Sequence, residues 1–482
     1  MKLSGRGVPS GLYLGGTFTN AASGATFPVL DPATGARLAS VADGGVSDAR
    51  RALDAAAAAQ PGFAALAPRA RSEMLRRAFE AMLADTDHLA ALIVAENGKA
   101  MKDAVAEVNY AAEFFRWFAE EAVRVDGSLG VAPSGANRIV VMRQPIGVSV
   151  LITPWNFPAA MLTRKLAPAL AAGCAVVAKP AEDTPLTALA IAELLERAGV
   201  PAGVVNVVPT SHPGEVVDAL LGDDRVRKLS FTGSTEVGRL LLAKAAARVI
   251  DCSMELGGNA PFLVFADADL DAAVEGALVA KLRNGGQACT SANRFYVQAA
   301  VADAFAEALA ARMADLRVGP GSEEGVDVGP LINAEALEKV SGLVQGALAL
   351  GARALVGGAA PGGEGYFYPP TVLREVPDTA AIVRSEIFGP VAPIVTFDSE
   401  ADAVALANDT EFGLVAYCYT GDLARGLRVA EALECGMVGL NRGVISDPAA
   451  PFGGTKQSGL GREGGHLGID EFLETKYVAC SW

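Results

Sequence analysis

Histidine is scarce in this sequence. Its three histidines are His88, His212 and His466; no two of them are four residues apart, and none lies near a group of cysteines. Zinc in proteins is normally held by several histidine and cysteine ligands, so we expect no metal site. The same scarcity argues against a Ser-His-Asp or Cys-His catalytic arrangement. A catalytic cysteine in this chain is therefore expected to use a carboxylate as its base.

Paired cysteines are also missing. The six cysteines form no CxxC pair and have no regular spacing, which is typical of free thiols in a reducing compartment. Residues 1–16 hold no continuous apolar segment and no arginine-rich amphipathic pattern, so we expect neither a signal peptide nor a transit peptide. Together these features predict a cytoplasmic protein.

Basic residues are outnumbered by acidic ones. There are 40 lysines and arginines against 55 aspartates and glutamates, which gives a net charge of −15. Such a charge disfavours binding to nucleic acid or to an anionic membrane, and an anionic substrate would need local basic residues. The longest apolar stretch, 139–152, contains Arg143 and Pro145, so it cannot be a membrane-spanning helix.

What the sequence does contain is an α/β pattern. A chain of 482 residues is too long for one hydrophobic core, so we expect two or more domains. Helical periodicity runs through 46–125. Within 147–255, short apolar runs alternate with helical segments, which predicts parallel strands joined by helical crossovers. A second α/β stretch begins near Gly257, and residues 471–482 have the character of a strand that could pair with the edge of a neighbour's sheet.

One cysteine stands in an unusual setting. Cys289 lies in the segment NGGQACTSANR, where Gly285 and Gly286 let the backbone bend and approach a ligand. Upstream, the segment MELGGNAPF places a single carboxylate, Glu255, beside paired glycines. A nucleophilic thiol and a separate base are two parts of an acyl-enzyme mechanism. Taken singly, a cysteine is more often buried and inert, and a glutamate is more often a solvated charge.

Two predicted strand ends carry candidate cofactor contacts. In FTGSTEVG a strand runs directly into a helix, and Gly233 and Ser234 leave room for an anion at the helix start. In KPAEDTP, Lys179 could meet a phosphate or ribose hydroxyl, and Glu182 could accept hydrogen bonds from the 2′- and 3′-hydroxyls of a ribose. Because a carboxylate there repels a 2′-phosphate, NAD is favoured over NADP. By itself, either turn is more simply explained as a helix cap.

Seven motifs together carry a resemblance to a known family. They occur in one order along the chain: PWNFP (154–158), KPAEDTP (179–185), FTGSTEVG (231–238), MELGGNAPF (254–262), NGGQACTSANR (284–294), EIFGPVAP (386–393) and PFGGTKQSGLGREGG (451–465). In this order they resemble the aldehyde dehydrogenase superfamily from about residue 20 to 480. The sequences around the first and last motifs are most similar to the succinate-semialdehyde dehydrogenase branch.

The resemblance implies an α/β fold with a Rossmann-like parallel-sheet NAD domain, an α/β catalytic domain and a small β-flap for oligomerisation into a homodimer or homotetramer. The boundaries it implies are 1–131 and 147–255 for the NAD-binding domain, 256–440 for the catalytic domain, 132–146 and 468–482 for the flap, and 441–467 for a C-terminal segment at the substrate pocket.

The resemblance also implies roles for particular residues. Cys289 is the expected nucleophile, Glu255 the base that activates water, and Asn156 a donor to the oxyanion together with the Cys289 backbone N–H. The residues expected around NAD, with NADP as an alternative, are Trp155, Lys179, Pro180, Ala181, Glu182, Gly233, Ser234, Leu256, Glu386 and Phe388. The residues expected to hold the carboxylate of a semialdehyde substrate are Arg164, Arg283 and Ser458. Lys165 and Glu463 are expected to pass protons.

Three positions depart from the pattern of that branch. Ser291 stands where many relatives carry a second cysteine, which excludes a disulfide with Cys289. Thr455 replaces a more usual aliphatic residue, and Leu282 replaces a more usual aromatic one. Both changes are expected to reshape the substrate channel, so the preferred length of the aldehyde stays open.

The expected reaction is the oxidation of succinate semialdehyde to succinate with NAD⁺, through a thiohemiacetal and then a thioester on Cys289. Glutarate semialdehyde or another aldehyde stays open as the substrate, because one methylene changes discrimination by only ~1–3 kcal/mol. Glu255 disfavours a CoA-acylating enzyme, since acylating relatives commonly lack this base. The intact Cys289, Glu255 and Asn156 disfavour a non-catalytic NAD-binding protein. The lack of a histidine partner disfavours a cysteine hydrolase.

Overall fold

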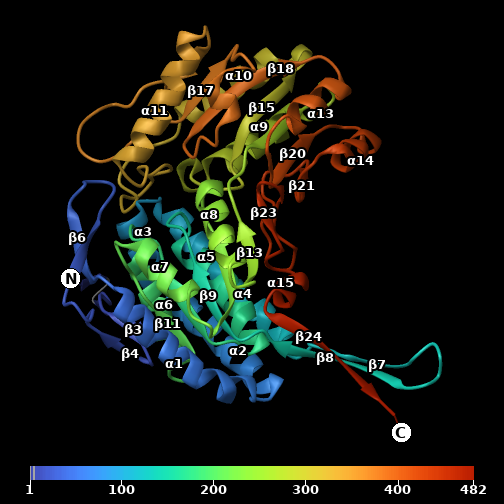
Figure 1. Cartoon of the computed structure of the whole chain (residues 1–482). Coiled ribbons are helices and arrows are strands. Elements are labelled where there is room, and N and C mark those ends of the chain that lie inside the picture. Colours follow the sequence, from blue (N-terminus) through green and yellow to red (C-terminus); the bar gives the residue numbers. More distant parts are fainter. Residues whose placement is uncertain (1, 4–5, 482) are drawn as a thin grey trace.

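A large mixed sheet forms the lower part of the molecule in Figure 1. The computed structural model describes residues 2–3 and 6–481. The strand order is β23-β13-β12-β9-β10-β11-β3-β4. Neighbours from β13 to β11 are parallel, whereas β23, β3 and β4 are added antiparallel at the two edges. The strands are β3 (Leu12–Leu14), β4 (Thr17–Thr19), β9 (Val148–Ile152), β10 (Val176–Lys179), β11 (Val205–Val207), β12 (Val226–Thr232), β13 (Asp251–Glu255) and β23 (Gly459–Leu460).

The strand order of this sheet reverses beside β9. The chain runs from β9 through β10 to β11 on one side, and then returns to build β12 and β13 on the other. At such a reversal the carboxyl ends of parallel strands leave a crevice that suits a ligand. The motifs PWNFP, KPAEDTP and FTGSTEVG follow β9, β10 and β12, so all three lie along this edge.

Helices pack against both faces of the sheet because its strands carry apolar residues on both sides. In β10, Val176 and Ala178 join one hydrophobic cluster, while the intervening Val177 joins another on the opposite face. The first cluster includes residues of α2 (Pro68–Ala84), α3 (Thr86–Asn97), α4 (Met101–Glu121), α5 (Pro158–Ala172) and α6 (Pro185–Arg197). The second includes residues of α1 (Val46–Ala64), α7 (Pro213–Leu221) and α8 (Thr235–Ala246).

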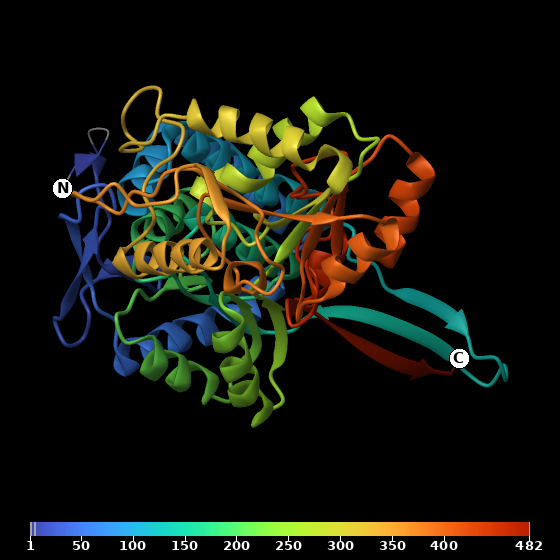
Figure 2. The ribbon, with the colours of Figure 1, turned by 90° about the horizontal axis from the view of Figure 1, so that it is seen from above.

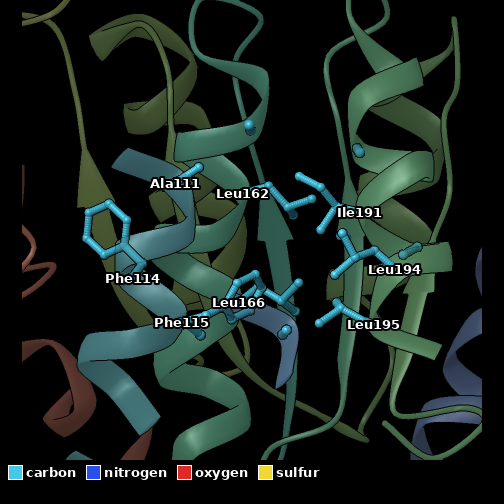
Figure 3. Close-up of a cluster of buried hydrophobic side chains, with 14 of the residues drawn as sticks. Ala111, Phe114, Phe115, Leu162, Leu166, Ile191, Leu194 and Leu195 are labelled. Atoms are coloured by element: carbon cyan, nitrogen blue, oxygen red, sulfur yellow. The ribbon is translucent and has the colours of Figure 1, made fainter. Parts of the chain in front are cut away.

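The first cluster fixes the helix that carries the candidate arginine Arg164. Figure 3 shows side chains from α4, α5 and α6 meeting in one apolar layer, and all are fully or almost fully buried: Ala111, Phe114, Phe115, Leu162, Leu166, Ile191, Leu194 and Leu195. Complete burial of each large apolar side chain contributes about 1.5–3 kcal/mol. The helix α5 is therefore firmly placed behind the crevice.

A second sheet lies above the first in Figure 1. Its order is β16-β17-β18-β15-β14-β20-β21, and its neighbours are parallel except for the pair β16–β17. The strands are β14 (Ala260–Val264), β15 (Ala292–Gln298), β16 (Arg353–Val356), β17 (Thr371–Arg374), β18 (Val391–Phe397), β20 (Val415–Tyr419) and β21 (Met437–Leu440). Its helices are α9 (Leu270–Leu282), α10 (Ala302–Ala314), α11 (Ala334–Ala349), α12 (Ala381–Arg384), α13 (Glu400–Asn408) and α14 (Leu423–Ala432).

A small antiparallel sheet projects from the body of the molecule (Figures 1 and 2). It has the order β24-β8-β7, built from β7 (Ser128–Val131), β8 (Arg138–Pro145) and β24 (Leu473–Cys480). We call these strands the β-flap. The flap begins four residues earlier than the sequence predicted, because β7 pairs with β8 rather than ending the preceding segment. β24 pairs along its whole length with β8 and is the edge strand of this sheet, so its expected pairing with a neighbour's sheet stays a prediction.

The remaining elements are short. They are β1 (Lys2–Leu3), β2 (Arg6–Gly7), β5 (Thr26–Leu30), β6 (Arg37–Ala42), the 3₁₀ turns η1 (Arg283–Gly286) and η2 (Ala299–Val301), β19 (Phe412–Gly413), β22 (Thr455–Lys456) and α15 (Leu467–Asp470). The predicted α/β class with a Rossmann-like parallel sheet is confirmed. Residues 1 and 482, the outer ends of the predicted segments 1–131 and 468–482, lie outside the described residues.

Two general features complete the fold. Along residues 2–3 and 6–481, no helix combines the length and the apolar character needed to cross a bilayer. All six cysteines are free: Cys174, Cys252, Cys289, Cys418, Cys435 and Cys480.

Candidate active site

The turn before Cys289 requires an unusual backbone. Asn284, Gly285 and Gly286 all adopt positive φ angles, of 51°, 61° and 80°. A Cβ atom on Gly286 would lie 2.2 Å from the carbonyl oxygen of Gly389, so only glycine fits there. This turn leads the chain from α9 to β15 and leaves Cys289 half-buried on the wall of a cleft.

Asn156 approaches the same turn from the opposite side of the cleft. Its side-chain Nδ2 donates a hydrogen bond to the main-chain oxygen of Gln287 across 3.0 Å. In return, the Asn284 Nδ2 donates to the main-chain oxygen of Asn156 across 2.7 Å. Because an amide nitrogen carries two hydrogens, one N–H of Asn156 is left for another acceptor. The arrangement brings a neutral donor beside the predicted nucleophile.

Glu255 is a buried carboxyl at the end of β13. Among the described residues neither of its carboxyl oxygens has a hydrogen-bond partner. Burial raises its pKa well above the usual 4.5, and the nearby Glu463 raises it further, while Lys165, Arg164 and Arg462 lower it. A carboxyl with a raised pKa and free oxygens holds a proton more readily than an exposed glutamate, which suits a general base.

The thiol of Cys289 is strongly affected by its surroundings. Burial raises its pKa to about 12, and the charges of Glu386 and Glu255 raise it further, whereas Arg164 and Arg283 lower it. The thiol is therefore protonated at neutral pH in the protein alone. A thiolate requires proton removal by a neighbouring base or a positive charge that arrives with a ligand.

The cleft beside Cys289 has a volume of about 650 Å³. The residues lining it include Asn156 and Cys289 together with nearly all of the predicted cofactor contacts: Trp155, Lys179, Ala181, Glu182, Gly233, Ser234, Leu256, Glu386 and Phe388. Pro180 is buried next to them but does not line the cleft. Glu255 does not line it either, although its neighbour Leu256 does.

The residues of the cleft fit a dinucleotide. Ser234 caps α8 by accepting from the backbone N–H of Val237 at 3.3 Å, and the other N–H groups of that first turn have no carbonyl within the helix to reach. Lys179 is buried at the cleft wall and pairs with the half-exposed Glu182 at 3.0 Å. These groups offer donors to phosphates and a carboxylate to a ribose.

The other end of the cleft is held by the segment EIFGPVAP. Glu386 accepts a hydrogen bond from the backbone N–H of Gly258 at 3.1 Å, and Phe388 meets Trp155 edge-on with ring centroids 5.5 Å apart. Asn293 fixes this segment, because its Nδ2 donates to the oxygen of Ser385 at 2.7 Å and its Oδ1 accepts from the N–H of Ile387 at 2.9 Å. Sequence reasoning did not single out Asn293, whose motif position gave no sign of this role.

Arg164 lies buried on α5, facing away from solvent. Its Nη2 donates to the hydroxyl of Tyr110 at 2.6 Å, and Nη1 lies 3.5 Å from Glu463. Its guanidinium stacks 4.0 Å from the ring centroid of Phe452, and its Nε has no hydrogen-bond partner in the described part of the chain. This nitrogen is a buried donor left unpaired by those residues, which suits an anionic ligand.

The three predicted substrate residues do not share one environment. Arg283 lies over the ring of Phe157, 5.4 Å from its centroid, and its charge acts on Cys289. Ser458 is completely buried, where its hydroxyl donates to the oxygen of Gly257 at 2.7 Å and accepts from the N–H of Gly413 at 2.9 Å. Both of its hydrogen-bonding capacities are thus used inside the protein.

Other expectations near the site meet mixed outcomes. Lys165 and Glu463 form a buried pair at 2.5 Å, and their role in passing protons stays a prediction. The hydroxyl of Thr455 donates to the main-chain oxygens of Gly413 and Glu434, both at 3.3 Å, so it serves the strand pair β19–β22. The hydroxyl of Ser291 donates to the oxygen of Lys281 at 3.1 Å.

Metal ligands do not gather in this cleft. Within the described ranges, no group of three or more histidine, cysteine, aspartate or glutamate side chains could hold a metal ion. The chemistry that the arrangement supports is addition of a thiol to a carbonyl, with an amide donor at the oxyanion and a separate carboxyl for proton transfer.

Comparison with known proteins supports the same conclusion. Residues 18–478 match the model of the aldehyde dehydrogenase family. A glutarate-semialdehyde dehydrogenase from Pseudomonas putida is 53% identical over 97% of this chain and 97% of its own length. A succinate-semialdehyde dehydrogenase from Paenarthrobacter nicotinovorans is 55% identical over 92% of this chain and 99% of its own length. The crystal structure of an NADP dependent enzyme from E. coli has a TM-score of 0.97 at 50% identity and covers 98% of both chains.

These similarities extend over nearly the whole chain and include both large sheets and the cleft between them. The chain therefore belongs to the aldehyde dehydrogenase family and is an oxidoreductase that oxidises aldehydes with NAD(P) as its cofactor.

Proposed function

We propose that this enzyme oxidises succinate semialdehyde to succinate with NAD⁺. The observation that carries the proposal is a pair of arginines near the nucleophile: Arg164 is buried with an Nε that the described residues leave unpaired, and Arg283 lies over the ring of Phe157. The charges of both lower the pKa of the Cys289 thiol. A guanidinium offers paired donors that match a carboxylate. In a chain with a net charge of −15, such a local positive field favours an aldehyde that carries a carboxylate at its far end.

The reaction begins when the Cys289 sulfur, having lost its proton, adds to the carbonyl carbon and forms a thiohemiacetal. The negative oxygen that develops is stabilised by the free N–H of the Asn156 amide and the backbone N–H of Cys289; one such donor is typically worth ~2.7–4 kcal/mol. When bound, NAD⁺ supplies the hydride acceptor, and the oxidised carbon is left as a thioester on Cys289. Glu255 then removes a proton from water, which attacks the thioester and releases the carboxylate and the thiol.

Glutarate semialdehyde is a second candidate substrate. The specific observation in its favour is that an enzyme named for it is as similar to this chain as one named for succinate semialdehyde. The two substrates differ by one methylene, and a pocket discriminates such a difference by ~1–3 kcal/mol. Both would present the same carboxylate to the two arginines.

The proposed preference for NAD⁺ rests on Glu182. Its carboxylate lines the cleft, is half-exposed and pairs with Lys179 through Oε2. Its Oε1 can accept a hydrogen bond from a ribose hydroxyl, and its charge repels a 2′-phosphate. The E. coli relative is an NADP dependent enzyme, so the preference of this chain is a separate property that needs its own measurement.

A homodimer or homotetramer is proposed on the basis of the β-flap. Leu129, Val131 and Tyr477 leave 67%, 58% and 58% of their surface exposed there, and large exposed apolar side chains on sheet edges commonly mark contact surfaces.

We also propose that the first sheet binds NAD and that the second carries the catalytic residues. A cytoplasmic location is proposed because it suits the free cysteines.

The deciding experiment is a panel of aldehydes assayed with NAD⁺ and NADP⁺. We expect kcat/KM for succinate semialdehyde to exceed that for a neutral aldehyde of equal length, such as butanal, by roughly 10- to 100-fold, as expected for a charge-assisted contact. Glutarate semialdehyde in the same panel decides the length preference. Equal kcat/KM for the semialdehydes and butanal would refute the carboxylate site. A separate assay of NADH formation with and without CoA tests whether the acyl group is transferred from Cys289 to the CoA thiol instead of to water.

A further inference from the structure

The link between α3 and α4 holds a set of buried polar side chains that the mechanism above does not use. Glu96 and Asn97 end α3, Gly98 and Lys99 follow in the link, and the three polar side chains are almost completely buried. Glu96 accepts hydrogen bonds from the backbone N–H groups of Leu186 and Thr187 at 2.7 and 2.9 Å, while Asn97 donates to the oxygen of Trp155 at 3.1 Å. Their partners lie in the cleft-forming segments rather than in their own helices.

Lys99 reaches furthest toward the reaction centre. Its Nζ donates to the main-chain oxygen of Asn156 at 2.8 Å and to Glu107 at 2.5 Å. The same ammonium lies 4.0 Å from the ring centroid of Phe157. Burial lowers the pKa of Lys99, and the carboxylate of Glu107 counteracts that effect. Glu107 is therefore the group that favours the charged, three-donor form of the lysine.

Glu107 also holds the helix that begins immediately after Asn156. Its Oε1 accepts from the backbone N–H groups of Ala159 and Ala160 at 2.9 and 3.3 Å. These are the first N–H groups that α5 can offer, since it starts at Pro158, which has none. The Glu107 carboxylate thus caps α5 and also pairs with Lys99, which donates a hydrogen bond to Asn156.

Asn156 is consequently held from two directions. Lys99 and Asn284 both donate to its main-chain oxygen, and its own Nδ2 donates to Gln287. A buried ion pair is by itself weak support for stability, because desolvation offsets most of the attraction. What the pair Lys99–Glu107 adds is a fixed position for the residue at the oxyanion.

We propose that Lys99 and Glu107 are positioning residues that hold the Asn156 amide where the oxyanion forms. This inference rests on the proposed function of Asn156 as an oxyanion donor. Displacement of a reacting group by about 1 Å can cost ~10²-fold in rate. We therefore expect Lys99→Met to lower kcat by roughly 10- to 100-fold, while KM for the semialdehyde changes by less than about threefold because the substrate arginines are untouched.

The test is a double-mutant cycle between Lys99→Met and Asn156→Ala, with kcat and KM measured for all four proteins. If Lys99 acts through Asn156, the lysine substitution costs at most about twofold once Asn156 is alanine, because there is no donor left to position. Equal losses from Lys99→Met in both backgrounds would overturn the inference. If Asn156→Ala alone leaves kcat unchanged, the oxyanion role itself fails, which is a distinguishable result.

Two further variants guard against a folding defect. In Lys99→Met/Glu107→Gln the buried charges are removed together, which is commonly tolerated, and the glutamine oxygen can still accept from the N–H groups of Ala159 and Ala160. This protein should keep its melting temperature and still show the reduced kcat. Restored kcat in the double variant would contradict the positioning role. Lys228→Met is the matched control, since Lys228 is an equally buried lysine that pairs with Asp251 and Glu471. Its effect on kcat should be at most about twofold and additive with Asn156→Ala.

Discussion

The side-chain amide of Asn156 donates a hydrogen bond to the carbonyl of Gln287, a residue only two positions before Cys289. The bond joins the end of β9 in the first sheet to the turn that opens β15 in the second. The bond therefore couples the proposed oxyanion donor to the turn that carries the proposed nucleophile. The substrate carbonyl meets a preorganised pair of groups, although they come from different sheets.

Removal of Arg283 should affect binding of one class of substrate. We predict that Arg283→Ala raises KM for succinate semialdehyde by roughly 10- to 100-fold, because a charge-assisted hydrogen bond of ~1.5–3 kcal/mol is lost. Steady-state assays with butanal provide the control, and KM for butanal should change little. Equal losses on both aldehydes would show that Arg283 supports the fold of the turn rather than the substrate.

The reactivity of Cys289 should depend steeply on pH in the protein without cofactor. Burial, with Glu386 and Glu255, raises the thiol pKa to about 12, so the thiolate fraction rises about tenfold for each pH unit below that value. We predict that carbamidomethylation of Cys289 by iodoacetamide, followed by peptide mass spectrometry, accelerates continuously from pH 7 to pH 10. A rate that levels off near pH 8 would be incompatible with this environment.

Replacement of Glu255 by glutamine should raise the melting temperature at high pH but slow the reaction. The pKa of Glu255 is raised in the folded protein, so folding favours its protonated form. This contribution is complete below the unfolded-state pKa and is lost as pH rises through the folded-state value. Glu255→Gln should therefore gain melting temperature relative to the wild type as pH increases from 5 to 8. Deacylation should slow by about 10²- to 10⁴-fold.

Two measurements check the effect of Glu255→Gln, namely differential scanning fluorimetry across this pH range and a pre-steady-state burst of NADH. The expected result is a retained burst followed by a slow steady state. A melting-temperature difference that shrinks as pH rises would contradict the raised pKa of Glu255. Loss of the burst would contradict the assignment of Glu255 as the base for water.

The cofactor preference should shift when Glu182 is shortened. In Glu182→Ser the carboxylate that opposes a 2′-phosphate is gone, and Lys179 loses its partner at 3.0 Å and becomes available to the phosphate. We predict that kcat/KM for NADP⁺ rises at least about tenfold, equivalent to ~1.4 kcal/mol. Kinetics with both cofactors at fixed aldehyde provide the measurement. An unchanged NAD⁺/NADP⁺ ratio would show that the selectivity lies elsewhere in the cleft.

Much of the first sheet could be predicted from the sequence because its signals are local. Apolar runs such as Val176–Lys179 are buried on both faces, and each is followed by a turn and a helix with a clear start. The expected cofactor contacts in KPAEDTP also rest on a local signal, and they stay a prediction. Lys179 and Glu182 lie three residues apart on one turn, so their pairing needs no knowledge of distant elements.

The parts that the sequence could not predict depend on contacts between distant residues. The edge strands β3 and β4 are short, and β3 joins the sheet through a pairing between Tyr13 and Val207. Ser458 was expected at the substrate, but its hydroxyl is occupied by Gly257 and Gly413, which no local pattern reveals. The role of Lys99 likewise depends on Asn156, far along the chain.

The pairing of Glu255 with Gly459 ties the end of the chain to the centre of the enzyme. From β23 the backbone continues past Glu463, whose carboxylate adjoins Lys165, and only then enters the β-flap as β24. A cut between residues 463 and 473 would therefore separate the flap strand from the segment that pairs with Glu255, and β24 would then depend on its pairing with β8. The C-terminal segment links the reaction centre covalently to the β-flap. The intact mass of the protein is therefore a useful quality criterion for active preparations.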